Sequence, residues 1–160
     1  MIEYSFRRAK LSDMDDLYRL SNEKLVRSNS IHPENIIFED HVKWLQKVLS
    51  DKKYLILVVE QAGRFVGQVK FNIDNSNATI SLSLKVSHRG KGTGTMIISE
   101  SVEYLINMRK EMSDIIAYIK NDNIASMRSF EKAGFVYMGL EEVNGITLSR
   151  YAKNIDRGNV

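Results

Sequence analysis

Two segments between residues 12 and 49 carry apolar side chains at helical spacing. Leu17, Leu20 and Leu25 predict the buried side of one helix. That helix should start at Ser12, because Asp15, three residues later, resembles the second half of a capping box. A polar loop then covers residues 28–36, and a second helix is expected over residues 38–49. The core-facing positions of the second helix would be Phe38, Val42, Leu45 and Leu49.

The middle of the chain changes to the period of extended strands. Branched and aromatic residues dominate the runs 54–61, 65–74 and 78–87, and turn residues separate these runs. The connections are too short for parallel crossovers, so we expect an antiparallel meander. A further short strand is expected over residues 4–10.

The second half of the chain alternates helices and strands. A helix should run to about Met108, and strand 114–121 should lie parallel to strand 78–87 because a helix connects them. A short helix then ends near Gly134, and Asn144-Gly145 predicts a closing hairpin. The order β-α-α-β-β-β-α-β-α-β-β predicts an α/β fold with a central mixed, mostly antiparallel sheet and about four helices.

Length, charge and cysteine content narrow the classes of function. The chain has 160 residues, which suits a single domain over residues 1–160. Its 23 basic and 20 acidic side chains are interleaved, so no basic stripe indicates a nucleic-acid partner. The longest apolar run, residues 54–59, is far shorter than the roughly 20 residues of a membrane span. The chain has no cysteine, so we expect no thiolate metal site and a cytoplasmic location.

Residues 89–94, Arg-Gly-Lys-Gly-Thr-Gly, stand between a predicted strand and a predicted helix. A glycine-rich turn that opens a helix presents backbone N–H groups at the positive end of the helix dipole, which suits phosphate. Such a segment can also be an ordinary strand-to-helix turn. Two common phosphate loops do not match, because no lysine follows Gly94 and Ile97 stands where the dinucleotide-binding fingerprint has its last glycine.

Residues Arg89–Gly94 do match R-x-x-G-x-G, which resembles the coenzyme A pyrophosphate loop of the GNAT acyltransferase superfamily. A second stretch, Asn123–Phe135, resembles that family's N-x-x-[AS]-x-x-x-[YF]-x-K-x-G-F pattern. The predicted order of elements is also that of the family. The resemblance implies an N-acetyltransferase that uses acetyl-CoA as cosubstrate and no metal. It also implies two parallel strands that splay apart to admit coenzyme A.

The resemblance further implies which residues contact coenzyme A. The pantetheine chain would pair with backbone groups near Leu84 and Val86 like an extra strand, and the Val86 N–H would stabilise the oxyanion of the reacting thioester. Asn123 would contact the pantetheine, although a plain helix cap explains it equally well. The other implied contacts are Arg89, Gly90, Lys91, Gly92, Thr93, Gly94, Thr95, Ser126 and Phe130.

Direct attack of an amine on a thioester needs no nucleophilic side chain, but two proton transfers remain. Many relatives protonate the departing thiolate with a tyrosine at the position that Phe130 occupies here. Tyr118, Ser126 or a water would replace it, or no acid is needed. The candidate bases are His41, which titrates near neutrality, and Glu60 at a strand end. Each also has a structural alternative, as a core histidine and as a solvated carboxylate.

The acceptor amine is predicted from Arg27 and the His-x-x-Trp pattern of His41 and Trp44. This pattern resembles the GNAT enzymes of pseudaminic and legionaminic acid synthesis, which acetylate a nucleotide-linked 4-amino-4,6-dideoxy sugar. In that interpretation Arg27 holds a diphosphate and Trp44 packs on a ring. The same pattern occurs in relatives that acetylate ribosomal-protein N-termini. A peptide N-terminus, another small amine and a non-catalytic acetyl-CoA-binding module therefore stay open, and a homodimer is implied only as a family habit.

Overall fold

A computed structural model describes residues 3–155 of the chain. The helices are α1 (Met14–Ser21), α2 (Lys24–Ser28), α3 (Phe38–Leu49), α4 (Thr93–Met108) and α5 (Ile124–Lys132). The strands are β1 (Ser5–Arg8), β2 (Tyr54–Gln61), β3 (Arg64–Asp74), β4 (Asn77–Leu84), β5 (Asp114–Lys120), β6 (Val136–Val143) and β7 (Ile146–Asn154). Two 3₁₀ turns cover Leu11–Asp13 and Val86–His88. Within the described residues, no helix is both long and apolar enough to cross a membrane.

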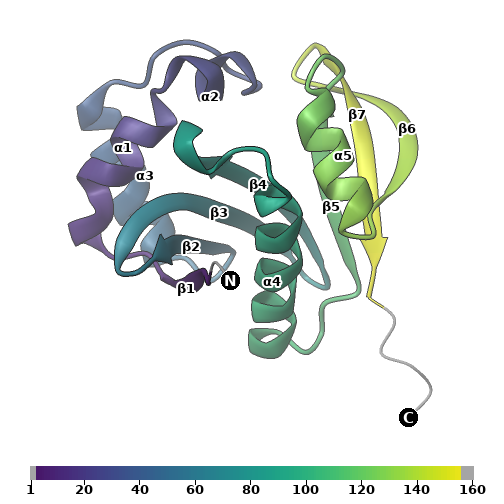
Figure 1. Ribbon diagram of the computed structural model, residues 1–160, viewed down its shortest axis with the longest axis horizontal. Helices are drawn as coiled ribbons and strands as arrows, with labels where there is room; N and C mark the ends of the chain where they lie inside the picture. Colours follow the sequence, from purple (N-terminus) through teal and green to yellow (C-terminus); the bar gives the residue numbers. More distant parts are fainter. Residues whose placement is uncertain (1–2, 156–160) are drawn as a thin grey trace.

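The strands form one sheet in the order β1-β2-β3-β4-β5-β7-β6 (Figure 1). Only β4 and β5 pair in parallel, and all other neighbours are antiparallel. The predicted mixed sheet, the β2–β3–β4 meander and the β6–β7 hairpin are therefore confirmed. Asn144 and Gly145 have φ of +51° and +79°, the left-handed values that a two-residue hairpin turn requires.

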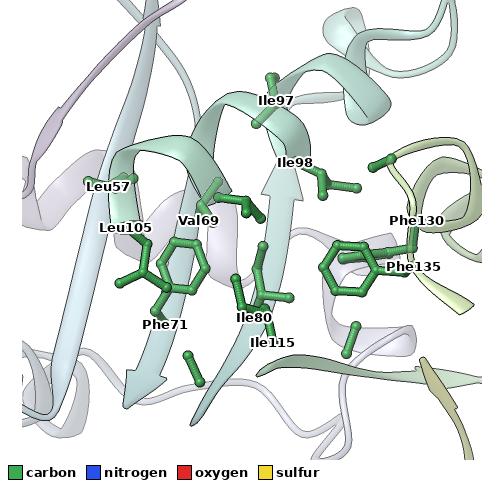
Figure 2. Packing of buried hydrophobic residues seen from close by; sticks show 14 of the residues in the cluster. Leu57, Val69, Phe71, Ile80, Ile97, Ile98, Leu105, Ile115, Phe130 and Phe135 are labelled. Atoms are coloured by element: carbon green, nitrogen blue, oxygen red, sulfur yellow. The ribbon is translucent and has the colours of Figure 1, made fainter. Parts of the chain in front are cut away.

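Alternation along the strands gives the sheet two buried faces. On one face, strand residues pack against α4, as Leu57, Val69, Phe71 and Ile80 do against Ile97, Ile98 and Leu105 (Figure 2). Phe130 of α5 and Phe135 extend this cluster. The opposite face packs on α1 and α3, where Ile56 and Val58 contact the cluster that contains Leu17 and Leu45. A ligand that reaches the sheet must therefore do so where no helix covers it.

The N-terminal helices differ from the prediction. Residues Leu11–Asp13 form a 3₁₀ turn, and the Asp13 carboxylate accepts the Lys10 N–H at 2.7 Å. The expected helix start at Ser12 and its capping box are therefore wrong, and α1 begins at Met14. Helix α1 also ends at Ser21, so α2 is a separate helix, and the described residues contain five helices instead of the predicted four or so.

Two apolar residues that were expected in the core are exposed. Leu25 lies on α2 and is 50% exposed, because the interruption after Ser21 turns α2 away from the sheet. Phe38 is 40% exposed and packs edge-on against the ring of Tyr18 at the start of α3. Helical spacing predicted that both side chains would face the core, but it did not indicate the break before α2 that accompanies the exposure of Leu25.

Candidate active site

Strands β4 and β5 pair only at their first residues. Their parallel register joins Asn77–Thr79 to Asp114–Ile116, although β4 continues to Leu84 and β5 to Lys120. On their outer sides, β3 pairs along all of β4 and β7 along all of β5. Backbone groups on the inner sides of the two diverging ends therefore have no strand partner. This β4–β5 split confirms the predicted pair of splayed parallel strands (Figure 1).

Strand β4 ends at Leu84, three residues before the predicted end of the strand. The 3₁₀ turn Val86–His88 follows, and Val86 is 66% exposed. The Val86 carbonyl accepts the Arg89 N–H at 3.1 Å, whereas the Val86 N–H donates to no other residue that the structure describes. A free N–H beside the split can bind an oxygen atom, and its contact with a thioester stays a prediction.

The glycine segment forms a left-handed turn before α4. Gly90, Lys91 and Gly92 have φ of +78°, +59° and +77°, a region that glycine occupies without strain. Gly92 is the N-cap of α4 and supplies no side-chain cap, so the N–H groups of Gly94 and Thr95 in the first turn have no intrahelical partner. The positive end of the α4 dipole is therefore open to an anion.

The side chain of Arg89 turns away from the start of α4. Its Nε donates to the Leu84 carbonyl at 2.9 Å, and its Nη2 forms an ion pair with Glu23, also at 2.9 Å. Arg89 thus fixes the end of β4 to the start of α2. The predicted contact between this arginine and a pyrophosphate is untested.

Helix α2 contacts residues from both sides of the split. At its start, Glu23 pairs with Arg89 beyond the end of β4. At its end, the Ser28 carbonyl accepts a hydrogen bond of 2.8 Å from the Nζ atom of Lys120, which is the last residue of β5. The contacts of Arg89 and Lys120 with α2 therefore link the two diverging strands through this short helix.

Helix α5 lies against the start of α4. A Cβ atom on Gly94 would lie 3.0 Å from Ser129 Oγ, so a glycine lets the two helices approach closely. The Asn123 side chain accepts the Ser126 N–H at 3.3 Å and is the cap of α5. Phe130 is 3% exposed and packs edge-on against Phe135 with ring centroids 5.0 Å apart (Figure 2). The structure shows these roles, and contact of Asn123, Ser126 and Phe130 with coenzyme A stays a prediction.

A cavity of about 320 Å³ lies between α1, α3 and β3. Six residues line it: Ser21, Ile36, Asp40, His41, Trp44 and Lys70. The structure therefore brings together the two residues of the His-x-x-Trp pattern. Lys70 was not predicted, because it alternates with the apolar residues Val69 and Phe71 and such a lysine normally faces solvent.

His41 is 2% exposed and lies between the rings of Tyr18 and Trp44, at centroid distances of 5.3 and 5.6 Å. Burial lowers the pKa of His41, the charge of Lys70 lowers it further, and a hydrogen bond with the backbone of Met14 acts in the opposite direction. Nε2 has no hydrogen-bond partner among the described residues. A neutral imidazole that donates from Nδ1 keeps the Nε2 lone pair free to accept a proton.

Lys70 is half-buried on β3, with Nζ 5.3 Å from the centre of the Trp44 ring. It belongs to none of the ion pairs in the described part of the chain. Burial, and secondly the charge of Arg27, lower the pKa of Lys70 from 10.5 to about 8. The cavity therefore contains a cation without an anionic partner.

Arg27 organises the predicted polar loop instead of lining the cavity. Its guanidinium donates to the carbonyls of Ser21, His32 and Glu34 at 2.6, 2.9 and 3.3 Å, and to Ser30 Oγ at 3.2 Å. Most of its N–H groups are therefore occupied by the loop. The predicted contact with a diphosphate is untested and would compete with these bonds.

Glu60 and Tyr118 lie on strands β2 and β5, which β3 and β4 separate in the sheet. Glu60 on β2 pairs with Arg7 at 2.8 Å, and Arg7 also pairs with Asp13 at 2.7 Å, so this carboxylate belongs to a charged cluster beside β1. Tyr118 lies on β5, two residues past its last pair with β4. Burial first, and then a hydrogen bond to Glu141, raise the pKa of Tyr118, so it keeps its proton at neutral pH. No cluster of metal-ligating side chains occurs among the described residues.

Comparisons with known proteins agree with this geometry. A family model described as an acetyltransferase (GNAT) domain matches residues 5–136. YwnH of Bacillus subtilis (strain 168), whose name suggests a phosphinothricin acetyltransferase, is 23% identical over 143 residues, 85% of this chain and 86% of YwnH.

Two solved structures show the same fold. The aminoglycoside acetyltransferase AAC(6')-Ib in complex with coenzyme A aligns with a TM-score of 0.83 at 20% identity, over 95% of each chain. The spermidine N-acetyltransferase from Vibrio cholerae, in complex with CoA and spermine, aligns with a TM-score of 0.82 at 21% identity. That alignment covers 94% of this chain and 95% of the Vibrio protein.

Proposed function

The chain belongs to the GNAT acetyltransferase family, and from this premise we propose that it transfers an acetyl group from acetyl-CoA to a primary amine. The observation that carries the proposal is the β4–β5 split, which leads directly into the open start of α4. Acetyl-CoA has amides that can pair with a free strand edge and phosphates that suit a helix N-terminus. Both solved structures compared above contain coenzyme A.

The residues at the split fit this cosubstrate. The free Val86 N–H and the backbone of Leu84, whose carbonyl also accepts Arg89 Nε, would bind the pantetheine. The N–H groups of Gly94 and Thr95 would bind the pyrophosphate. Gly90, Lys91, Gly92 and Thr93 complete the turn, while α5 supplies Asn123, Ser126 and Phe130. Bound acetyl-CoA supplies an activated thioester, and the chain contributes orientation and proton transfer.

Three groups would take part in the chemistry: two would transfer protons and one would stabilise the oxyanion. His41 Nε2 accepts the proton of the amine, because the imidazole is neutral and this atom has no partner among the described residues. The Val86 N–H stabilises the oxyanion. Tyr118, which is protonated at neutral pH, would donate to the departing thiolate in place of its hydrogen bond with Glu141. Glu60 is the weaker candidate base, because Arg7 already binds its carboxylate.

The acceptor that we propose is a nucleotide-linked 4-amino-4,6-dideoxy sugar. The cavity places Trp44, a flat apolar surface on which a sugar ring can pack, next to His41. A peptide N-terminus is the alternative acceptor, and a non-catalytic acetyl-CoA-binding module is the alternative without chemistry. A cytoplasmic location and a homodimer also remain predictions.

Thiol release from acetyl-CoA in the presence of different amines tests the proposed function. The panel contains the nucleotide-linked amino sugar, a peptide with a free N-terminus, and a blank without amine. Faster release with the sugar than with the peptide supports the proposed acceptor, and the reverse order favours the peptide. Binding of acetyl-CoA without release above the blank for any amine would refute the catalytic function and leave the binding module.

A further inference from the structure

Lys70 is placed where an acceptor would approach the split. It pairs across the sheet with Ser81 of β4, two residues past Thr79, the last β4 residue that pairs with β5. Its side chain lines the cavity, which lies on the face of the sheet that α1 and α3 cover. The Lys70 side of the cavity is therefore one strand away from the point where β4 leaves β5.

The charges around Lys70 do not neutralise it. The charge of Arg27 lowers the pKa of Lys70 by repulsion, after burial as the larger cause. Asp40 lines the same cavity but forms no ion pair with Lys70, and Trp44 offers only its ring face. His41 is kept neutral partly by the charge of Lys70 itself. The cavity thus favours a negatively charged occupant.

The same cavity also contains a polar atom that is buried and has no partner. His41 is 2% exposed, and its Nε2 finds no hydrogen-bond partner among the described residues. A buried polar atom without a partner costs free energy, which a ligand that donates a hydrogen bond would recover. An amine supplies such a donor, so one molecule with an amine and an anionic group satisfies both features.

We propose that the acceptor is a primary amine that also carries an anionic group, a carboxylate or a phosphate, and that Lys70 binds this group. The inference rests on the proposed acetyltransferase function and assigns to Lys70 the anionic group of the acceptor, which a nucleotide-linked sugar carries as its diphosphate. A polycationic amine would meet the repulsion of Lys70 and Arg27. Spermine, which is bound in the Vibrio structure, and aminoglycosides, after which AAC(6')-Ib is named, are therefore expected to be poor acceptors here.

Matched pairs of amines test the proposal. Methionine is compared with methioninamide, and glucosamine 6-phosphate with glucosamine, so that each pair differs in one anionic group. We expect kcat/KM from thiol release to be at least tenfold higher for the anionic member of one pair or both. The pair that responds distinguishes carboxylate from phosphate. The proposal would be overturned by an equal or higher kcat/KM for the members without the anionic group, or by a preference for spermidine.

Variants at Lys70 connect the preference to this side chain. Lys70→Met should abolish the difference within a pair, measured at a pH above the acidic limb of the kcat/KM profile, and should leave the affinity for acetyl-CoA unchanged. Lys70→Glu should shift the preference toward spermidine. Lys43→Met removes an exposed charge on α3 outside the cavity and should keep the wild-type preference. Equal losses for anionic and neutral amines in Lys70→Met would contradict anion binding.

Failure of the proposed function can be recognised separately. If no amine is acetylated although acetyl-CoA binds, the catalytic function fails, and the same pairs are compared by titration calorimetry. Stronger binding of the anionic members to the wild type than to Lys70→Met would still support the anion site. Equal binding to both proteins would overturn it.

Discussion

The Glu23 carboxylate and the Arg89 guanidinium meet at 2.9 Å and hold the start of α2 against the end of β4. Both side chains are partly exposed, so the pair contributes little to global stability. The pair matters for where it lies, because it holds one end of α2 to β4 while Lys120 of β5 binds the other end.

Glu23→Gln should loosen α2 without unfolding the protein. We expect the amides of α2, residues 24–28, to exchange faster with solvent, while the free energy of unfolding changes by less than about 1 kcal/mol. Hydrogen-exchange mass spectrometry and urea titration measure the two effects. Glu142→Gln, an exposed change on β6 outside the observed ion pairs, is the control. Unchanged exchange in α2 would show that the ion pair does not hold the helix.

Gly92→Asp should weaken acetyl-CoA binding by about tenfold or more, because a carboxylate at the N-cap of α4 would repel the pyrophosphate. The matched control is Gly92→Asn. Asparagine has nearly the same shape and tolerates the φ of +77° without bringing a charge. Calorimetry with acetyl-CoA compares the two variants. Equal affinities for the aspartate and asparagine variants would refute a pyrophosphate site at this turn.

The pH profile of kcat/KM should identify His41 as the base. The pKa of His41 is lowered from 6.5, the ordinary value for histidine. Activity should therefore be lost on acidification only below pH 6.5. His41→Gln should remove this acidic limb and reduce kcat/KM by about 10²-fold. Lys70→Met should move the limb to higher pH, because a positive charge that lowers the pKa is gone. An acidic limb that persists unchanged in His41→Gln would assign the base to another group.

The stability of the protein should depend on Lys70 in the alkaline range. The folded chain releases this proton at about pH 8 and the unfolded chain near 10.5, so the unfolded state binds more protons between these values. The contribution of Lys70 to stability therefore rises with pH through this window and is lost as the pH falls through 8.

Lys70→Met tests this dependence. We expect the variant to be more stable than the wild type at pH 7, by about 1 kcal/mol because a half-buried charge keeps part of its hydration. The difference should shrink as the pH approaches 10.5. Urea unfolding at several pH values measures it, with Lys43→Met as the control for an exposed lysine. A difference that is constant with pH would disprove the lowered pKa.

Phe130→Tyr should not accelerate the reaction. The ring is buried against Phe135, so the new hydroxyl group would lie within a hydrophobic cluster and cost about 1–3 kcal/mol of stability. We expect kcat to change by less than tenfold, because attack of the amine limits the rate. Steady-state kinetics and thermal unfolding measure both effects. A tenfold or larger rise in kcat would show that thiolate protonation had been limiting.

The sequence predicted the elements whose local pattern agrees with their tertiary contacts. Strand β2 and helix α3 have the expected bounds, because β2 is one continuous run of mostly apolar residues and α3 has helical spacing along its length. The break between α1 and α2 was not predicted, since Leu25 continues the helical spacing although the chain turns at Asn22.

Prediction of the candidate site depended on how local its parts are. The glycine turn is contiguous and its left-handed residues could be anticipated from the sequence. Lys70 could not, because its burial comes from helices α1 and α3, which are distant in sequence and cover only part of the sheet. Arg27 was assigned to a ligand, whereas its hydrogen bonds go to carbonyls of the following loop.

The short β4–β5 register has a consequence for how the protein opens. Strands β1 to β4 form one half of the sheet, strands β5 to β7 form the other, and three residue pairs join the two halves. A boundary with so few backbone hydrogen bonds is where partial unfolding is expected to begin. A cosubstrate that binds to both diverging strands would close this boundary, and its binding free energy would add to the cohesion of the halves. Acetyl-CoA would then act as the missing strand of the sheet as well as the acetyl donor.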